Sequence, residues 1–261
     1  MTASASLWGP ARAPGLDLHS RLLYRDGLML ILDKPHGVPV HKGPKGGRPG
    51  EINLEQFFDQ LMFGLPRPPA LAHRLDKDTS GCLVLGRHRK ALEKLALLFK
   101  QGKVGKTYWA VVEGEPAADE GAIDLPLGRL DETRGWWMKV DPAGQQSRTN
   151  WRVLGRGTDP DTRLPIAWLA MEPVTGRTHQ LRVHSQAMGW PILGDPIYGT
   201  APREGGTPLH LHSRAIVVPI SKNKEPVAAT APVPGHMRER LLACGWDGVE
   251  ALPPSSAPIT N

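Results

Sequence analysis

The nine residues 73–81 place a carboxylate where it could do chemistry. Asp76 stands beside a basic residue, follows a proline-rich run and is succeeded by the small-residue turn Thr79-Ser80-Gly81. The apolar run 82–85 comes directly afterwards and predicts a buried strand. A rigid approach, a tight turn and a buried strand would hold Asp76 in one position. A carboxylate held in this way can attack carbon or accept a proton.

A second polar cluster occupies residues 177–184, with the sequence Arg-Thr-His-Gln-Leu-Arg-Val-His. Its alternation predicts a strand in which His179 points inward with Leu181 and Val183. The opposite face would carry three polar side chains, namely Gln180, Arg182 and His184. Polar groups gathered on one face of a central strand indicate a functional site.

The composition favours one β-rich domain with a polyanionic partner. The chain has 261 residues, 40% of them hydrophobic, and its 26 prolines and 29 glycines favour turns and strands over helices. It carries 32 Lys and Arg against 26 Asp and Glu, a net charge of +6 with a pI of about 9.5. This surplus suits nucleic acid and raises its encounter rate through long-range attraction. A merely basic protein is the alternative on charge alone.

The cysteines and the absence of long apolar runs bear on location. Cys82 and Cys244 lie far apart without a C-x-x-C spacing, which favours a reducing compartment and leaves a single disulfide open. Residues 1–20 lack the apolar stretch of a secretory signal, and no run approaches the ~18 apolar residues of a membrane span. We therefore expect a soluble, cytoplasmic and monomeric protein without a membrane partner.

Local patterns predict three helices and several strands. Asn53 and Gln56 can form a capping box at the start of the first helix. The second helix covers 89–101 with Gly102 in the C-cap position, and a short third covers 237–243. Apolar and β-branched runs predict further strands at 28–32, 107–114, 166–171 and 209–218.

These elements predict one α+β domain on a long, mixed and mostly antiparallel sheet with flanking helices. The chain shows no internal repeat, βαβ alternation, Walker-type loop or G-x-G-x-x-G, which argues against a nucleotide-cofactor fold. Residues 1–21 form an expected N-terminal extension, 22–220 the domain, and 221–261 a tail that is partly packed or disordered. Trp136 and Trp137 lie near basic residues and could stack bases, with one of them in the core.

Several motifs in a fixed order resemble a known family. His73-Arg74-Leu75-Asp76 with Thr79-Ser80-Gly81 resembles the signature of the RluA-type pseudouridine synthases. Lys106-Thr107-Tyr108 and the segment 176–184 follow in the family's order. The resemblance extends through Gly194-Asp195, Tyr198-Gly199 and the strand from Leu209 to Ser213, and it covers roughly residues 22–220. It implies the pseudouridine synthase fold with a central RNA-binding cleft.

The resemblance also implies an activity. Members of this family convert selected uridines in ribosomal RNA, transfer RNA or both to pseudouridine, without a metal or any other cofactor. Many relatives carry an S4-type RNA-binding module, for which residues 1–21 are too short. The chain therefore resembles the catalytic-domain-only members, and we expect the loops 36–50 and 128–150 to select the target.

Individual roles follow from the matched motifs. The resemblance assigns the catalytic nucleophile to Asp76 and its ion-pair partner to Arg182. It implies that Tyr108 stacks on the flipped base or assists proton removal. It also implies that Arg74 extrudes the target nucleotide or takes its place in the stack. The remaining candidates for contact with RNA are His73, Thr79, Arg177, His179, Gln180 and Leu211, the last as an apolar wall of the pocket.

The chemistry of the isomerisation fits these roles. Uracil must leave C1′, rotate and reattach through C5 while the C5 proton is lost. An ionised Asp76 can attack carbon, or it can remove a sugar proton and generate a glycal, and both routes stay open. A base inside a duplex must first be flipped out at a cost of a few kcal/mol. Stacking on Tyr108 would recover ~1–3 kcal/mol.

Two other classes of protein are alternatives to a pseudouridine synthase. A metal-dependent hydrolase is the alternative enzyme, because His-x-His pairs can chelate zinc. The histidines concerned are His73, His179, His184, His210 and His212. No acidic cluster accompanies them, and several would lie on opposite strand faces. The third class is an inactive RNA-binding protein with the same fold, against which the intact set of Asp76, Tyr108 and Arg182 argues.

Overall fold

The computed structural model describes residues 16–42, 52–131, 136–221 and 223–250. The expected extension up to residue 15, the basic loop 43–50 and the end of the expected tail lie outside these residues. The described strands are β1 (Leu22–Arg25), β2 (Met29–Lys34), β3 (Ala70–Leu71), β4 (Ser80–Gly86), β5 (Gly105–Glu113), β6 (Glu120–Asp124), β7 (Leu127–Arg129), β8 (Met138–Val140), β9 (Arg148–Thr158), β10 (Pro165–Pro173), β11 (Leu211–Val218) and β12 (Val227–Thr230). The helices are the 3₁₀ helix η1 (Leu54–Leu61), α1 (Arg89–Lys100), α2 (Gln180–Ala187) and α3 (Gly235–Ala243).

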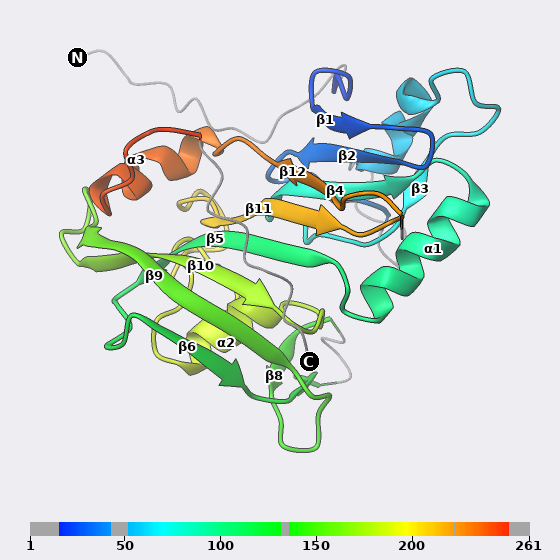
Figure 1. Ribbon diagram of the computed structural model, residues 1–261. Coiled ribbons are helices and arrows are strands. Elements are labelled where there is room, and N and C mark those ends of the chain that lie inside the picture. The colour runs from blue at the N-terminus through cyan, green and yellow to red at the C-terminus, as the bar shows by residue number, and fades with distance from the viewer. Residues whose placement is uncertain (1–15, 43–51, 132–135, 222, 251–261) are drawn as a thin grey trace, which may run out of the picture.

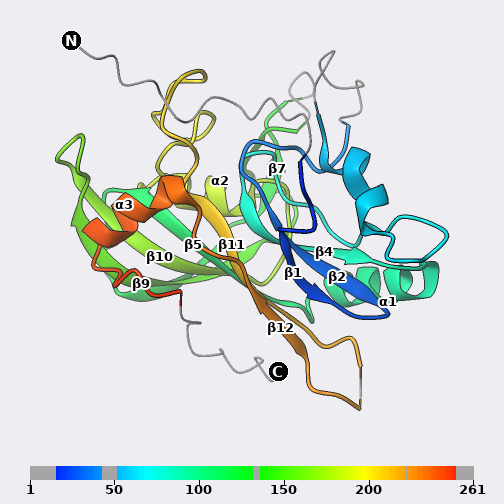
Figure 2. The ribbon, with the colours of Figure 1, turned by 90° about the horizontal axis from the view of Figure 1, so that it is seen from above.

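Within the described residues, ten strands form one sheet. Eight of them lie side by side in the order β1-β2-β4-β11-β5-β10-β9-β6, and the other two are β3 and β12. Strand β12 pairs with β11, β3 pairs with β4, and β7 and β8 form a separate two-stranded sheet. Strands β4 and β11 run parallel, whereas the other neighbouring strands run antiparallel. Figure 1 shows the sheet with α3 near one end and α1 near the other, and Figure 2 shows the same arrangement from above. The predicted α+β class and the mostly antiparallel sheet are confirmed.

Strand β5 separates two hydrophobic cores, as its alternation predicts. Tyr108, Ala110 and Val112 pack on the face that also receives η1 and α2. Trp109 and Val111 point to the other face, where α3 covers them. The same strand therefore supplies the floor of a site on one face and a supporting core on the other.

The predicted helix signals behave as expected at two places. The backbone N–H of Asn53 donates to Gln56 Oε1 at 3.2 Å, which completes the capping box of η1. Gly102 follows α1 with a φ of +67°, a left-handed conformation that favours glycine. The local sequence therefore determines where both helices begin or end.

The segment 177–184 corrects the prediction, because it is not a strand. Helix α2 begins at Gln180, and His179 precedes it with a left-handed φ of 52°. Residues from Gln180 to Ser185 are all buried, and only Gln186 and Ala187 at the end of the helix are exposed, so the first six positions show no helical period in the sequence. Gln180 and Arg182 therefore do not share a face, since residues two positions apart in a helix lie about 200° apart around its axis.

The described part of the expected C-terminal tail packs on the same sheet. Strand β12 pairs with β11, and Met237 and Leu241 of α3 are buried against Trp109. Cys82 and Cys244 are free, buried thiols. Among the described residues, no helix has the length and apolar character needed to cross a bilayer.

Two fully buried histidines make a prediction about acid stability. Burial lowers the pKa of both His210 and His212 to about 3, although nearby backbone carbonyls oppose it. Their folded pKa values lie below the ordinary value of about 6.5, so the unfolded chain takes up protons first as the pH falls. The stabilisation is therefore complete above pH ~6.5 and is lost towards pH ~3.

Between pH 7 and pH 5, each histidine should remove about 2 kcal/mol from the free energy of unfolding. We expect His212→Gln to weaken this pH dependence by about that amount in urea titrations at the two pH values. The exposed His19 provides the control, and His19→Gln should leave the dependence as it is in the parent chain. A parental pH dependence in His212→Gln would show that His212 is not responsible.

Candidate active site

Asp76 lies on the turn that leads into β4. The backbone N–H of Thr79 donates to the Asp76 carbonyl at 3.2 Å and closes this turn. Gly81 has a φ of +101°, and a Cβ there would lie 2.2 Å from the Ser213 carbonyl oxygen of β11. Glycine is therefore required where β4 and β11 run parallel, and this close approach fixes the turn against the centre of the sheet.

A buried lysine holds the same turn from within. Lys34 ends β2, and its Nζ donates to the carbonyls of Pro35 at 2.9 Å, Lys77 at 2.8 Å and Thr79 at 2.8 Å. Burial lowers the pKa of Lys34 to about 7, against the attraction of nearby carboxylates that include Asp76. The three carbonyls satisfy all three ammonium protons, so Lys34 fixes the backbone on both sides of Asp78.

Arg182 extends from α2 toward Asp76 but is held by another carboxylate. Its Nε and Nη2 donate to the two oxygens of Asp195, each at 2.7 Å, while Nη1 lies 3.9 Å from Asp76 Oδ2. Burial opposes ionisation of Asp195, yet hydrogen bonds from Arg182 and two backbone amides outweigh it and lower the Asp195 pKa. The expected Arg182–Asp76 ion pair is therefore present as a long contact of 3.9 Å, and the shorter partner of Arg182 is Asp195 at 2.7 Å.

The position of Asp195 depends on a second glycine. Gly194 has a φ of +77°, and a Cβ there would lie 2.2 Å from the carbonyl oxygen of Pro208. The Asp195 carboxylate also accepts hydrogen bonds from the amides of Ile197 at 2.9 Å and Tyr198 at 3.0 Å. The turn itself therefore helps to position the carboxylate to which Arg182 binds.

His179 is the second group that faces Asp76. Its Nε2 lies 3.8 Å from Asp76 Oδ2, and its Nδ1 lies 2.8 Å from the Tyr198 hydroxyl. That hydroxyl accepts from Met138 N at 2.9 Å, so its proton is available for Nδ1. In the tautomer in which Nδ1 accepts from this hydroxyl, the imidazole proton is on Nε2 and is directed at Asp76. Burial lowers the pKa of His179 despite the attraction of Asp76, which favours the neutral ring.

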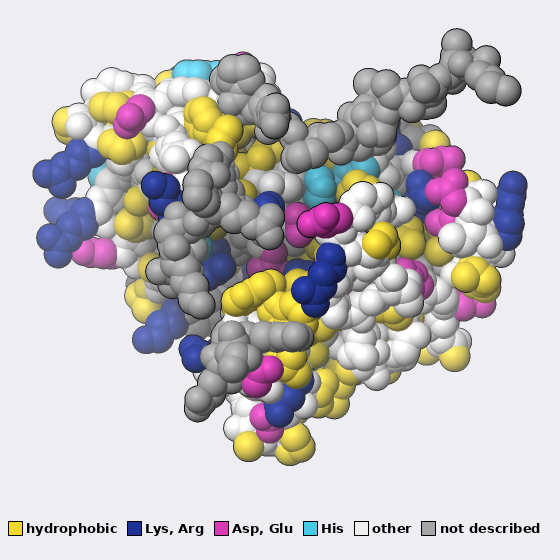
Figure 3. All heavy atoms as spheres, turned by 180° about the vertical axis from the view of Figure 1, so that it is seen from behind, with side chains coloured by type: hydrophobic (Ala, Val, Ile, Leu, Met, Phe, Trp, Pro, Cys, Tyr) yellow, Lys and Arg dark blue, Asp and Glu magenta, His cyan; other side chains and the backbone are white. Residues whose placement is uncertain are grey.

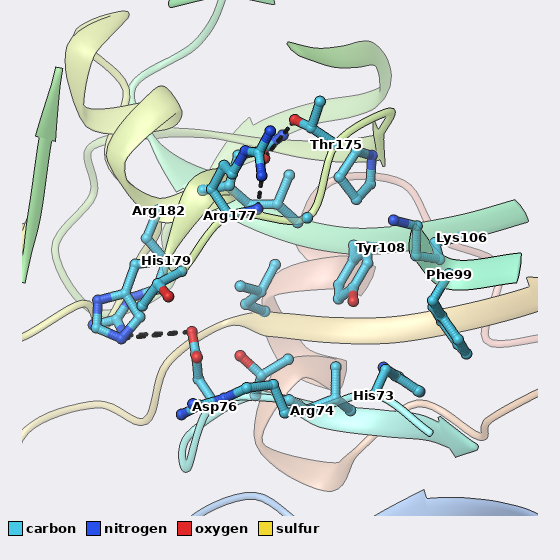
Figure 4. Close-up of a pocket in the computed structure, with 18 residues that line it drawn as sticks. His73, Arg74, Asp76, Phe99, Lys106, Tyr108, Thr175, Arg177, His179 and Arg182 are labelled. Atoms are coloured by element: carbon cyan, nitrogen blue, oxygen red, sulfur yellow. Dashed lines mark hydrogen bonds and ion pairs between the residues drawn. The ribbon is translucent and has the colours of Figure 1, made fainter. Parts of the chain in front are cut away.

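Tyr108 and Leu211 form an apolar wall beside these polar groups. Both are buried, and both line a cavity of about 300 Å³ that also contains Asp76 and Arg182. Figure 4 shows the Tyr108 ring and the Asp76 carboxylate facing the same space from different elements. Burial raises the pKa of Tyr108 above its ordinary value. The arrangement offers one flat aromatic surface and one carboxylate to a molecule inside.

The other predicted RNA contacts fall into two groups. Arg74 and Arg177 line both the cavity and a larger groove of about 980 Å³ that adjoins it. His73, Thr79 and Gln180 also border the cavity, and each has at least one polar atom that is hydrogen-bonded within the protein. Val84 N donates to His73 Nε2 at 3.0 Å, Lys34 Nζ bonds to the Thr79 carbonyl, and Gln180 Nε2 donates to the Arg148 carbonyl at 2.9 Å.

The larger groove separates the two loops that the sequence suggested for target selection. Residues 39–42 line one part, and residues of the 127–145 hairpin line another. Trp136 projects from that hairpin with 57% of its surface exposed, and its ring lies 5.6 Å from the His179 ring. Trp137 is half-buried, so neither tryptophan lies in the core, which corrects that part of the prediction. Figure 3 shows several Lys and Arg side chains on one face of the molecule, with acidic and apolar side chains among them.

Three residues that build the site were not among the predicted site residues, although two of them, Asp195 and Tyr198, lie in motifs of the resemblance. Lys34 fixes the turn that carries Asp76, and Asp195 holds Arg182. Tyr198 orients His179. A lysine at the end of an apolar strand was the available signal for Lys34. The alternative of a metal site finds no ligand set here, because the described residues contain no group of three or more His, Cys, Asp or Glu that could hold a metal ion.

The site combines a carboxylate beside a buried arginine with an aromatic wall, in a cavity that opens into a groove lined by basic residues, and it can hold a planar molecule next to the carboxylate. The model of the RNA pseudouridylate synthase family matches residues 28–187. The chain therefore belongs to this family, in its RluA-type branch, and is an isomerase that converts uridine in RNA to pseudouridine.

Known relatives and solved structures agree with this assignment. An uncharacterized RNA pseudouridine synthase of Zymomonas mobilis is 40% identical over 219 residues, covering 83% of this chain and 95% of that protein. Ribosomal large subunit pseudouridine synthase C of Vibrio cholerae is 35% identical over 234 residues, covering 86% and 69%. The structure of human RNA pseudouridylate synthase domain containing 4 superimposes with a TM-score of 0.68 at 27% identity, covering 86% and 94%.

Removing the charge of Asp195 tests the buried pair. Asp195→Asn removes the carboxylate that is hydrogen-bonded to the buried Arg182, and breaking such a pair costs about 3–5 kcal/mol. We expect the free energy of unfolding in urea to fall by about that amount. Pseudouridine formation should fall about tenfold or more, because Arg182 is then free to leave its position 3.9 Å from Asp76.

The matched control breaks an exposed pair on α1. Arg89 and Glu93 are 2.8 Å apart at the surface, so Glu93→Gln should change the free energy of unfolding by less than about 0.5 kcal/mol. Equal losses in the two variants would contradict the central role of Asp195.

Proposed function

We propose that the chain isomerises particular uridines of ribosomal or transfer RNA, with Asp76 as the reacting carboxylate. The observation that carries this proposal is that Asp76 lines a cavity together with Arg182, Tyr108 and Leu211. A uridine flipped into this cavity would bring C1′ toward Asp76 and its base against Tyr108. The name of the Vibrio cholerae relative supports ribosomal RNA as the first substrate to examine.

The reaction balances within the nucleotide itself. The C1′–N1 bond breaks with its electron pair on N1, the base turns, and C5 bonds to C1′. C5 then loses its proton while N1 gains one. Asp76 either attacks C1′ and forms a covalent ester to the sugar, or removes a sugar proton to give a glycal. Both routes use the ionised carboxylate, and Arg182 stabilises that charge from 3.9 Å.

Tyr108 acts through its ring in this proposal. Stacking of the flipped base on the ring would be worth about 1–3 kcal/mol and would offset part of the cost of flipping. Burial raises the pKa of Tyr108, so the phenol stays protonated near neutral pH. A role as a hydrogen-bond donor or stacking surface is therefore favoured over a role as a phenolate base.

The groove of about 980 Å³ is the proposed path of the RNA. Arg74 and Arg177 lie where it meets the inner cavity, so they can hold the phosphates that flank the flipped nucleotide. Arg74 is exposed and follows the cavity wall at His73, which suits the expected role of filling the vacated stack. Trp136 supplies an exposed aromatic surface for a neighbouring base.

The proposal extends to a cytoplasmic monomer that uses no nucleotide cofactor. The isomerisation needs no outside oxidant, reductant or group donor, which supports the absence of a cofactor. Ribosomal RNA, the substrate class in the name of the Vibrio cholerae relative, is a cytoplasmic molecule in bacteria. Chemical mapping of pseudouridine in total RNA, with and without the protein, would identify the RNA and the uridine.

Replacing the carboxylate tests the proposed role of Asp76. With tritium at uridine C5, each turnover releases the label to water, and Asp76→Asn should reduce this release by about a thousandfold or more. RNA affinity should stay within about threefold, because the amide has nearly the same volume as the carboxylate. Asp78→Asn on the same turn is the matched control and should keep most of the activity. Release at the parental rate in Asp76→Asn would rule out this role.

Removing the exposed ring tests the RNA path. Trp136→Ala should weaken RNA binding by about 1–3 kcal/mol, roughly 5- to 150-fold in Kd, whereas Trp136→Phe should keep most of the affinity. The slope of log Kd against log salt should not change, because no charge is removed. Leu164→Ala removes another exposed apolar side chain and should leave Kd unaltered. An equal loss in both alanine variants would refute stacking at Trp136.

A further inference from the structure

Lys106 lies in the wall of the inner cavity and has no role in the mechanism so far. It is two residues from Tyr108 on β5, so both side chains project from the same face of the strand. Both line the cavity that contains Asp76. Figure 4 shows Lys106 beyond Tyr108 as seen from Asp76, with its side chain turned toward the cavity.

The positive charge of Lys106 has no counterpart in the described protein. Among the described residues, no hydrogen bond or ion pair engages its ammonium group, although the side chain is half-buried. Burial lowers its pKa, and its charge in turn adds to burial in lowering the pKa of His73. By contrast, Arg182 is held by Asp195, and Lys34 by three carbonyls. An ammonium withdrawn from water without a partner is costly, which points to an acceptor supplied by the ligand.

The position of Lys106 favours the base over a phosphate as that acceptor. Lys106 borders the inner cavity but not the larger groove, whereas Arg74 and Arg177 border both. Residues two apart on a strand are about 7 Å apart, which is close to the length of a uracil ring with its exocyclic oxygens. With C1′ at Asp76 and the base on Tyr108, a uracil carbonyl oxygen therefore comes within reach of the Lys106 ammonium.

We propose that Lys106 is a catalytic residue that donates a hydrogen bond to a carbonyl oxygen of the target uracil. When the C1′–N1 bond breaks, its electron pair leaves with the base, and the negative charge spreads onto the carbonyl oxygens. The ammonium of Lys106 stabilises this charge more than it stabilises the neutral base, and it keeps the detached base in the cavity until C5 bonds to C1′. This inference rests on the proposed function of Asp76 and adds a second charged group to it.

Single-turnover kinetics on a uridine-containing RNA test the proposal. Lys106→Met should slow pseudouridine formation about a hundredfold with less than about a threefold change in RNA affinity. Lys106→Arg should recover part of the rate, because it restores a charged donor. Lys103→Met removes an exposed lysine just before β5 and should keep the parental rate.

The leaving group provides a readout that a structural role would not change. In RNA with 5-fluorouridine at the target position, the departing base is a weaker base and needs less stabilisation. The loss in Lys106→Met, measured as single-turnover consumption of the target nucleoside, should therefore be several-fold smaller than with uridine. Lys106→Gln, a neutral donor of similar length, serves if the Met variant folds poorly, and it should show the same dependence on the leaving group.

Three results would overturn the proposal. The first is a parental rate in folded Lys106→Met or Lys106→Gln. The second is weaker binding with a shallower salt dependence at an unchanged rate, which would make Lys106 a phosphate contact. The third is an equal loss with uridine and 5-fluorouridine. Loss of tritium release in Asp76→Asn is independent of all three, so failure of this inference is distinguishable from failure of the proposed function.

Discussion

The buried pair of Arg182 and Asp195 is the interaction on which the site depends. Its two hydrogen bonds of 2.7 Å join α2 to the turn after Gly194 and use two of the three guanidinium nitrogens. The remaining nitrogen, Nη1, is thereby held toward Asp76. The same turn carries Tyr198, which orients His179. One ion pair therefore fixes both groups that face the carboxylate.

The opposite side of Asp76 is fixed by the sheet. Lys34 extends from β2 and bonds to the carbonyls on either side of Asp78, while Gly81 allows β4 to approach β11 in the parallel pair. The strained φ of 52° at His179 is maintained because the first six residues of α2, Gln180 to Ser185, are all buried. The Asp76 carboxylate therefore lies between the turn before β4, which is bonded to the sheet, and helix α2, which carries Arg182.

Local signals in the sequence were sufficient for much of the fold and for the central acid. The capping box at Asn53, the glycine after α1 and the alternation of β5 depend on neighbours within a few residues, and each was confirmed. The prediction of a strand at 177–184 was wrong. Burial of every residue from Gln180 to Ser185 removes the amphipathic period that distinguishes a helix from a strand. The partners of Lys34 and Arg182 are up to 45 residues away in the chain, so no local pattern reveals them.

The arrangement of charges around Asp76 explains how a buried arginine can support the reaction that we propose for this carboxylate. A direct hydrogen-bonded pair would occupy the carboxylate oxygens that reach the sugar in the proposed mechanism, but 3.9 Å exceeds hydrogen-bond length. Asp195 takes the two short bonds instead, and the neutral His179 adds a dipole at 3.8 Å rather than a second charge. Asp76 therefore receives electrostatic stabilisation without being sequestered. The second acid is necessary because, without it, Arg182 would be free to close on Asp76.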